Sequence, residues 1–290
     1  MRRIIILISV YNDWDSLKKL IYEIDKNIKE FNDINFECLI INDASTIHQP
    51  KIIKPKKFSS LSILNMRQNK GHARCNAFGI RYVFQKKDFD NLILMDGDGE
   101  DRPSEIKSLI KKIIVSPNTS VVAKRVKRSE GFIFKMLYQI HKFITIFFTG
   151  KNVNFGNYSI LTKVDVEKLY SKATLWSSYS GSVKKYIKPL NEINSVRGLR
   201  YFGPSKMSLL KLIIHSLSII AVFKYEVFLR SAILIVVLAY LNSYLENFLI
   251  FFQILLVIFN LIIFIVSKRE RKNELINSYK NLDEIISIKN

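Results

Sequence analysis

The chain has 290 residues and a formal net charge of +20, from 45 lysines and arginines against 25 aspartates and glutamates. Because 48% of its residues are hydrophobic, it can bury enough apolar surface to fold, which excludes an intrinsically disordered chain. Its two cysteines, Cys38 and Cys75, lack metal-ligand spacing, which excludes a disulfide scaffold and a cysteine zinc site. The positive charge alone fits nucleic acid, an anionic membrane or a phosphorylated substrate.

The first 125 residues alternate between strand-like and helix-like patterns. Apolar runs predict strands at 4–10, 36–41, 61–66, 91–95 and 121–122. Apolar residues at helical spacing predict helices over 17–31, 77–84 and, opened by Pro103, 106–113. This alternation indicates right-handed βαβ units in an open, mostly parallel α/β sheet. Ligands of such sheets bind beyond the carboxyl ends of the strands.

Two later stretches are apolar but too short or too interrupted to cross a bilayer. Residues 132–148 include Lys135, His141 and Lys142, and residues 209–223 include Lys211 and His215. Each stretch can lie on a membrane as an interfacial helix, with its lysine stems reaching water. The alternative for both is an ordinary core helix.

The C-terminal third predicts a transmembrane hairpin. Residues 248–266 carry no charge, and as a helix they span roughly 28 Å, close to the thickness of a hydrocarbon core. Residues 227–244 are apolar apart from Arg230. The turn between the two stretches contains Glu246 and no lysine or arginine, whereas Lys268–Lys272 is basic. The positive-inside rule therefore places both flanks in the cytosol. A bacterial-type inner membrane is the expected location.

The tail from Asn273 carries apolar residues at helical spacing, which predicts a helix that covers a surface or a partner. The predicted organisation is a catalytic domain over 1–205, an interfacial helix over 206–226, two transmembrane helices over 227–267 and a cytosolic tail over 268–290. A buried core hairpin is the disfavoured alternative to the two spans.

A cluster of carboxylates follows the strand at 91–95. In extended backbone Asp96 and Asp98 face the same side, so both carboxylates can converge on one cation. Oxygen ligands suit Mg²⁺ or Mn²⁺, which typically share their coordination shell with substrate phosphates. Two aspartates at this spacing are weak evidence by themselves, because acidic loops are commonly just solvated.

The sequence around this pair resembles a known signature. Residues 96–105 are similar to D-x-D-x-Q-D-x-P-x-E of family-two glycosyltransferases that act on polyprenyl phosphates, such as dolichyl-phosphate mannose synthases and GtrB-type enzymes. Four further segments resemble motifs of that family in the same order: 10–13 (V/P-x-Y-N-E), 42–45 (D-D-x-S), 69–79 (N-x-G-x-x-x-A-x-x-x-G) and 200–206 (R-x-x-G-x-S-K). The resemblance covers essentially the whole chain, including the C-terminal pair of spans.

The resemblance implies a GT-A fold and an inverting transfer of sugar from a UDP- or GDP-linked donor to a polyprenyl phosphate. It implies nucleoside contacts by Asp13 and Asp43, although Asp43 can equally cap a turn. The implied substrate-binding set is Tyr11, Asp13, Asp43, Ser45, Gly71, Asp96 and Arg128. The implied metal set is Asp96, Asp98 and Glu100, with Glu100 in place of the family's glutamine. Residues 154–159 depart from the family's D-x-G-x-F-R, which leaves open how the acceptor or the sugar is held there.

Basic side chains fit this chemistry. A lipid phosphate is already ionised near neutral pH and can attack without a strong base, but it must approach a diphosphate. At roughly 5 Å and an effective dielectric near 20, two unit charges repel by about 3 kcal/mol. Cations offset that repulsion, and the candidates are Arg125, Arg128, Arg200 and Lys206. Of these, Arg125, Arg200 and Lys206 join Asp98 as predicted catalytic residues, and Arg128 belongs to the substrate-binding set. Their alternative role is a solvated basic face on an anionic membrane.

The sequence leaves two other functions open and disfavours two more. Direct transfer to a glycan or another non-lipid acceptor stays open, as does a non-catalytic membrane scaffold with the same fold. A processive polysaccharide synthase is disfavoured, because neither Trp14 nor Trp176 lies in a Q-x-x-R-W motif. Nucleic acid is not expected as a partner, because no basic-aromatic motif occurs. The expected partners are a nucleotide sugar, a polyprenyl phosphate and the membrane, and a homo-oligomer is left open.

Overall fold

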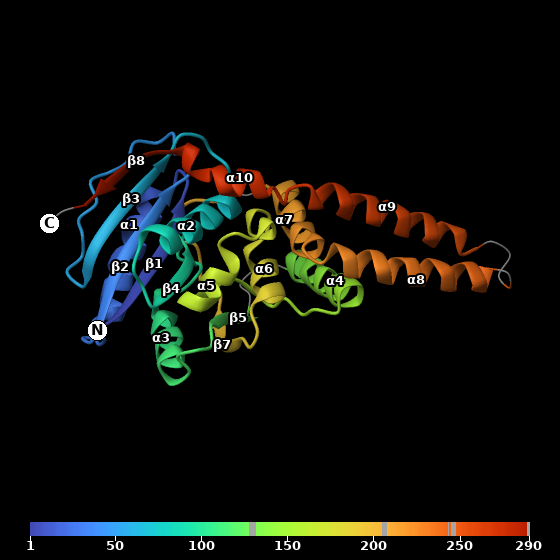
Figure 1. Ribbon diagram of the computed structural model, residues 1–290, viewed down its shortest axis with the longest axis horizontal. Coiled ribbons are helices and arrows are strands. Elements are labelled where there is room, and N and C mark those ends of the chain that lie inside the picture. Colours follow the sequence, from blue (N-terminus) through green and yellow to red (C-terminus); the bar gives the residue numbers. More distant parts are fainter. Residues whose placement is uncertain (128–131, 205–207, 243, 245–247, 289–290) are drawn as a thin grey trace.

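The structure is a computed structural model, and it describes residues 1–127, 132–204, 208–242, 244 and 248–288. Within these residues an eight-stranded sheet forms the body, in the order β7-β5-β6-β4-β1-β2-β3-β8 (Figure 1). Its strands are β1 Arg2–Val10, β2 Ile34–Asn42, β3 Phe58–Met66, β4 Asn91–Asp96, β5 Val121–Lys127, β6 Phe155–Thr162, β7 Asn191–Val196 and β8 Leu282–Ser287. Strands β1 to β4 pair in parallel, as do β5 and β7, while β6 and β8 run antiparallel to their neighbours. The predicted mostly parallel α/β sheet is confirmed.

Helices cover both faces of this sheet. Helices α1 Trp14–Ile28 and α3 Ile106–Val115 pack on one face, and α2 His72–Lys86, α5 Lys163–Leu169 and α6 Tyr179–Tyr186 pack on the other. Short 3₁₀ turns, η1 Pro103–Glu105 and η2 Ala173–Trp176, complete the two layers. Pro103 therefore opens a 3₁₀ turn, and α3 follows it directly.

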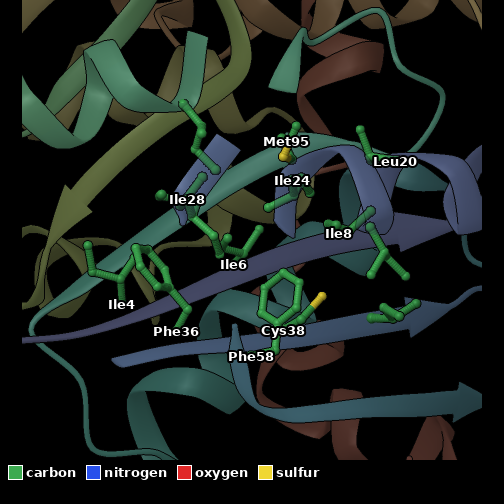
Figure 2. Close-up of a cluster of buried hydrophobic side chains, with 14 of the residues drawn as sticks. Ile4, Ile6, Ile8, Leu20, Ile24, Ile28, Phe36, Cys38, Phe58 and Met95 are labelled. Carbon is green, nitrogen blue, oxygen red and sulfur yellow. The ribbon is translucent and has the colours of Figure 1, made fainter. Parts of the chain in front are cut away.

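Strand β1 lies between two hydrophobic cores because its side chains alternate between the faces of the sheet. Ile4, Ile6 and Ile8 belong to the core beneath α1, whereas Ile5 and Leu7 belong to the core beneath α2. Figure 2 shows the first of these cores, with side chains of β1 lying close to those of α1. This double burial is the physical reason for the unbroken apolar run.

Helices α4 Phe132–Thr149 and α7 Leu209–Ala221 lie at the end of the body from which two further apolar helices project (Figure 1). They contact each other, and α7 also packs along α9. Phe143 and Phe147 of α4 and Leu210 and Ile213 of α7 remain exposed. The two amphipathic helices are therefore only partly covered by the protein.

Helices α8 Lys224–Asn242 and α9 Ile250–Ser267 lie side by side and extend away from the body (Figure 1). Their most apolar stretches have mean hydropathies of 1.6 and 2.8, and only 11% and 17% of these stretches are buried within the protein. By length and composition both helices can cross a bilayer. Arg230 of α8 donates to the backbone carbonyl of Phe147 at 2.8 Å. Glu246 lies outside the described residues.

The tail corrects one sequence expectation. Residues after α9 form α10 Lys272–Ile276, the 3₁₀ turn η3 Asn277–Asn281 and strand β8, so the helix that the spacing predicted does not continue. Strand β8 pairs antiparallel with β3 and so takes the edge position of the sheet, from Ser62 opposite Ser287 to Met66 opposite Leu282. The open backbone edge of β3 offers hydrogen bonds that outweigh the local helical pattern. The tail does cover a surface, since Leu275 is fully buried in the core beneath α2.

Candidate active site

Four loops converge at the carboxyl edge of the parallel strands, where this sheet type binds ligands. The loops after β1, β2, β3 and β4 carry Asp13, Asp43, Gly71 and the acidic run from Asp96, respectively. The sequence predicted this meeting point, and the structure brings all four loops together through the contacts described below.

The loops after β1 and β2 are joined by a set of hydrogen bonds. The backbone N–H of Asn12 donates to Ser45 Oγ at 2.9 Å. The side-chain oxygen of Asn12 accepts the backbone N–H groups of Thr46 and Ile47 at 2.8 and 3.1 Å. Asn12 adopts the left-handed conformation, with φ of 51°, which asparagine tolerates better than most residues. The adjacent Tyr11 remains 38% exposed at this edge and is free to contact a ligand.

Asp43 holds the loop that follows β3. Its two carboxylate oxygens accept the backbone N–H groups of Lys70 and Gly71, both at 2.8 Å. Gly71 has a φ of 90°, which favours glycine. Burial raises the pKa of Asp43, although the two backbone hydrogen bonds oppose the rise. These contacts match the alternative reading of Asp43 as a turn cap, and its nucleoside contact stays a prediction.

Asp96, at the end of β4, lies in a network that the sequence did not predict. Its Oδ1 is 3.1 Å from His72 Nε2 and accepts Asn157 Nδ2 at 2.8 Å. The opposite ring nitrogen of His72 lies 2.7 Å from Ser9 Oγ. Burial opposes ionisation of Asp96, but the charge of His72 and the donors from His72 and Asn157 outweigh it and lower the pKa. Asp96 is therefore a charged carboxylate at the strand end.

Asp98 faces a different set of partners. Its Oδ1 accepts the backbone N–H of Glu100 at 3.0 Å, and its Oδ2 accepts Arg200 Nη1 at 2.9 Å. Burial raises the pKa of Asp98 to about 6, with further contributions from the charges of Asp96 and Glu100. The same guanidinium of Arg200 also pairs with Asp13. Arg200 thereby joins the loops after β1 and β4.

Glu100, the third residue of the predicted metal set, contacts an arginine. Glu100 forms an ion pair with Arg197. The segment that carries both arginines lies against the acidic loop, because Gly198 N donates to Glu100 O at 2.8 Å and Tyr201 N donates to Asp98 O at 2.9 Å. These contacts place the loop after β7 beside the acidic site. A cavity of about 250 Å³ next to this loop is lined by Glu23 and Asn27 of α1 and by Tyr201, and by none of the predicted site residues.

Asp101 and Arg125 contact the acidic loop from its buried side. Asp101 Oδ2 accepts the backbone N–H of Asp96 at 2.9 Å, and Arg125 Nη2 lies 4.0 Å from Asp101 Oδ1. Burial and the charge of Asp96 raise the pKa of Asp101 to about 7. A side chain at Gly156 would overlap the Arg125 guanidinium, since a Cβ there would lie 2.3 Å from Nη2. Gly156 thus allows Arg125 to reach the acidic cluster.

The donor set at the end of β4 fits a divalent cation shared with a substrate. Asp96 and Asp98 offer carboxylate oxygens from one loop, and their side chains are 20% and 19% exposed. Within the described residues no three acidic, histidine or cysteine side chains form a ready-made metal cluster. Two carboxylates with substrate phosphates as the remaining ligands are a common way to hold Mg²⁺.

Two predicted site residues, Arg128 and Lys206, lie outside the described residues. His72, Asn157 and Arg197 were missed by sequence reasoning. His72 directly follows the Asn69–Gly71 motif at the first turn of α2, and Asn157 lies in the segment that departs from the family pattern. The contact of His72 and Asn157 with Asp96 depends on the pairing of β6 with β4, which the local sequence does not show.

Comparisons with known proteins agree with this geometry. The family model described as Glycosyl transferase family 2 matches residues 5–178. No curated protein sequence matches the chain. Glucosyl-3-phosphoglycerate synthase from Mycobacterium tuberculosis, crystallised with Mn²⁺, UDP and phosphoglyceric acid, is 12% identical and covers 78% of each chain at a TM-score of 0.53. A second mycobacterial protein of known crystal structure is 12% identical over 78% of this chain and 74% of its own, at a TM-score of 0.51.

Proposed function

Because the chain belongs to glycosyl transferase family 2, we propose that this glycosyltransferase moves a sugar from a nucleotide diphosphate sugar to a polyprenyl phosphate. The reaction would take place at the cytosolic face of a bacterial-type inner membrane. The two apolar helices α8 and α9 anchor the enzyme there, and α4 and α7 rest their exposed apolar side chains on the bilayer.

One observation carries the choice of a lipid acceptor. His215 of the amphipathic helix α7 lies within electrostatic reach of His72, Arg125 and Asp96, and also of His141 on α4. Burial, together with the nearby positive charges of His72 and Arg125, lowers the pKa of His215 to about 4. The helices suited to a membrane surface therefore adjoin the acidic site, so a lipid headgroup can reach the site from the bilayer.

The donor would bind along the edge formed by the loops after β1, β2 and β3. Asp13, Ser45 and Tyr11 lie on this edge, and the loop at Gly71 is fixed by Asp43. Asp96 and Asp98 would hold the divalent metal together with the donor diphosphate. When bound, Mg²⁺ or Mn²⁺ supplies positive charge that offsets the charge of the leaving diphosphate. The Mn²⁺ and UDP of the mycobacterial neighbour make these the first ligands to try.

The chemistry needs charge control more than proton transfer. An oxygen of the lipid phosphate forms a bond to the anomeric carbon, the bond from that carbon to the diphosphate breaks, and the nucleoside diphosphate leaves. The configuration inverts because attack and departure occur on opposite faces. Arg200 and Arg125 place guanidinium groups at the acidic loop, where they stabilise the phosphates in the transition state.

The full chain in liposomes, with labelled UDP- and GDP-sugars and Mn²⁺ or Mg²⁺, tests this proposal. We expect label to move into polyprenyl phosphate and not into the matched polyprenyl alcohol, which lacks the ionised nucleophile. A chelator should abolish the transfer. Transfer to soluble glycans with no transfer to the lipid phosphate would contradict the lipid acceptor. Failure to bind any nucleotide sugar would contradict catalysis itself.

A further inference from the structure

The tail after α9, which comprises α10, η3 and β8, lies against α2 and β3, next to the loops proposed to bind the donor. Leu275 is fully buried beneath α2, and the ring of Tyr279 packs edge-on against Phe78, with 5.6 Å between the ring centroids. Strand β8 then continues along β3, and Ile288 N donates to Leu61 O at 2.9 Å. The tail is therefore fixed at both ends against the elements that carry the donor loops.

Asn281 forms three hydrogen bonds with the two residues that directly follow β3. Its backbone carbonyl accepts Arg67 N at 2.7 Å, its side-chain oxygen accepts Gln68 N at 3.1 Å, and its side-chain nitrogen donates to Gln68 O at 2.9 Å. Lys70 and Gly71, whose N–H groups hold Asp43, follow Gln68 by two and three residues in the same loop. The tail thus limits the position of that loop from one side.

Glu284 starts a second connection, which runs through two carboxamides. Its carboxylate accepts Asn65 Nδ2 at 2.9 Å. The oxygen of Asn65 then accepts Asn42 Nδ2 at 2.8 Å, and the oxygen of Asn42 accepts the backbone N–H of Ser45 at 3.0 Å. Ser45 in turn accepts the N–H of Asn12. A continuous line of hydrogen bonds therefore joins the tail to the loops after β2 and β1.

The direction of this line is set by its two ends. A carboxylate can only accept hydrogen bonds and a backbone N–H can only donate, whereas a carboxamide can present either side. With Glu284 at one end, Asn65 must present its NH₂ to the tail, and each carboxamide must then present its oxygen toward Ser45. A donor in place of the carboxylate would conflict with the Ser45 N–H at the other end, so one junction of the line would set two donors or two acceptors against each other. A hydrogen-bonding group that loses its partner in this way costs free energy.

We propose that Glu284 is a positioning residue for donor binding: it orients the two carboxamides and thereby fixes the loop that carries Asp43 and Ser45. Glu284 itself is exposed and lies on the edge strand, so its effect is local and does not depend on core packing. The link from this loop to the nucleotide rests on the proposed function. The orientation of the loop by the tail does not.

The test uses the full chain in detergent micelles with Glu284→Lys, Glu284→Gln and Asp283→Lys. Asp283 is a matched control, because it is the neighbouring exposed carboxylate and, among the described residues, its ion pair is with Arg67, at 3.4 Å. Glutamine can still present an oxygen to Asn65, so Glu284→Gln should preserve the line. Calorimetry with UDP and with GDP, each with Mn²⁺, measures nucleotide affinity, and hydrogen exchange over residues 42–46 measures the order of the loop.

We expect Glu284→Lys to weaken nucleotide binding about three- to tenfold, the range for one lost hydrogen bond, and to speed exchange over residues 42–46. Glu284→Gln and Asp283→Lys should stay within about twofold of the unaltered protein. Equal exchange and equal affinity in Glu284→Lys and Asp283→Lys would overturn the proposal. If the unaltered protein binds neither nucleotide, the proposed function fails, and the exchange data alone decide whether Glu284 orders the loop.

Discussion

The acidic site and the helical hairpin of this protein are built in opposite ways. At the site, nearly every charged group has a partner: His72 and Asn157 on Asp96, and Arg200 on Asp98. In the hairpin, apolar side chains such as Ile258 and Leu261 of α9 remain exposed, with no protein surface over them. The charged groups of the first region are paired within the protein, whereas the exposed apolar surface of the second is a surface that the proposed bilayer would cover. The two regions should therefore fail separately when altered.

The largest expected effect concerns which side of the membrane each region occupies. A cysteine introduced by Glu246→Cys should be labelled only from outside sealed cells, and Lys268→Cys only after the membrane is opened. The reason is the asymmetry of lysine and arginine about the two spans. A membrane-impermeant maleimide gives an all-or-none readout. Labelling of both positions from the same side would show that α8 and α9 do not form a spanning hairpin.

The next effect separates chemistry from location. Asp98→Asn should lower turnover about 10²- to 10³-fold, because the variant loses a negative ligand at the proposed metal position. Membrane partition and thermal unfolding should change little. Asp33→Asn, at an exposed loop acid, is the matched control. Transfer assays and Mn²⁺ binding by calorimetry measure the effect, and near-normal turnover in Asp98→Asn would remove Asp98 from the metal site.

A smaller effect is expected where the two regions meet. Arg200→Gln removes the guanidinium that joins Asp13 and Asp98 and should lower kcat/KM about 10- to 100-fold, as for a lost charged hydrogen bond. We expect the loss to appear mainly as a higher KM for polyprenyl phosphate. Once a metal ion neutralises Asp98, the guanidinium is no longer needed there and can bind the acceptor phosphate. Kinetics with each substrate varied separately measure the split. A collapse of donor affinity with unchanged acceptor dependence would place Arg200 in donor binding instead.

Sequence patterns predicted the first region well where the physics is local. The buried run at Ile4–Ile8 and the amphipathic α1 follow from periodicity, and the acidic loop follows from its position after a strand. Two features could not be predicted in this way. The strand β8 depends on the free edge of β3, and the contact of His72 with Asn157 depends on the antiparallel pairing of β6 with β4. Both are pairings between segments far apart in the chain, which no local pattern contains.

The smallest expected effect compares one methyl group in each region. Ile6→Val deletes a methyl from a fully buried side chain between α1 and the sheet, which typically costs about 0.5–1.5 kcal/mol. For a body of this size the melting temperature should fall by roughly 2–4 °C. Ile258→Val in α9, where the side chain is 47% exposed, should shift it by less than about 1 °C, because in a micelle that methyl has apolar surroundings whether or not the body is folded. Thermal unfolding of both variants in the same detergent makes the comparison. Equal shifts would mean that α9 packs as part of the protein core, and that its apolar face is covered by protein instead of lipid.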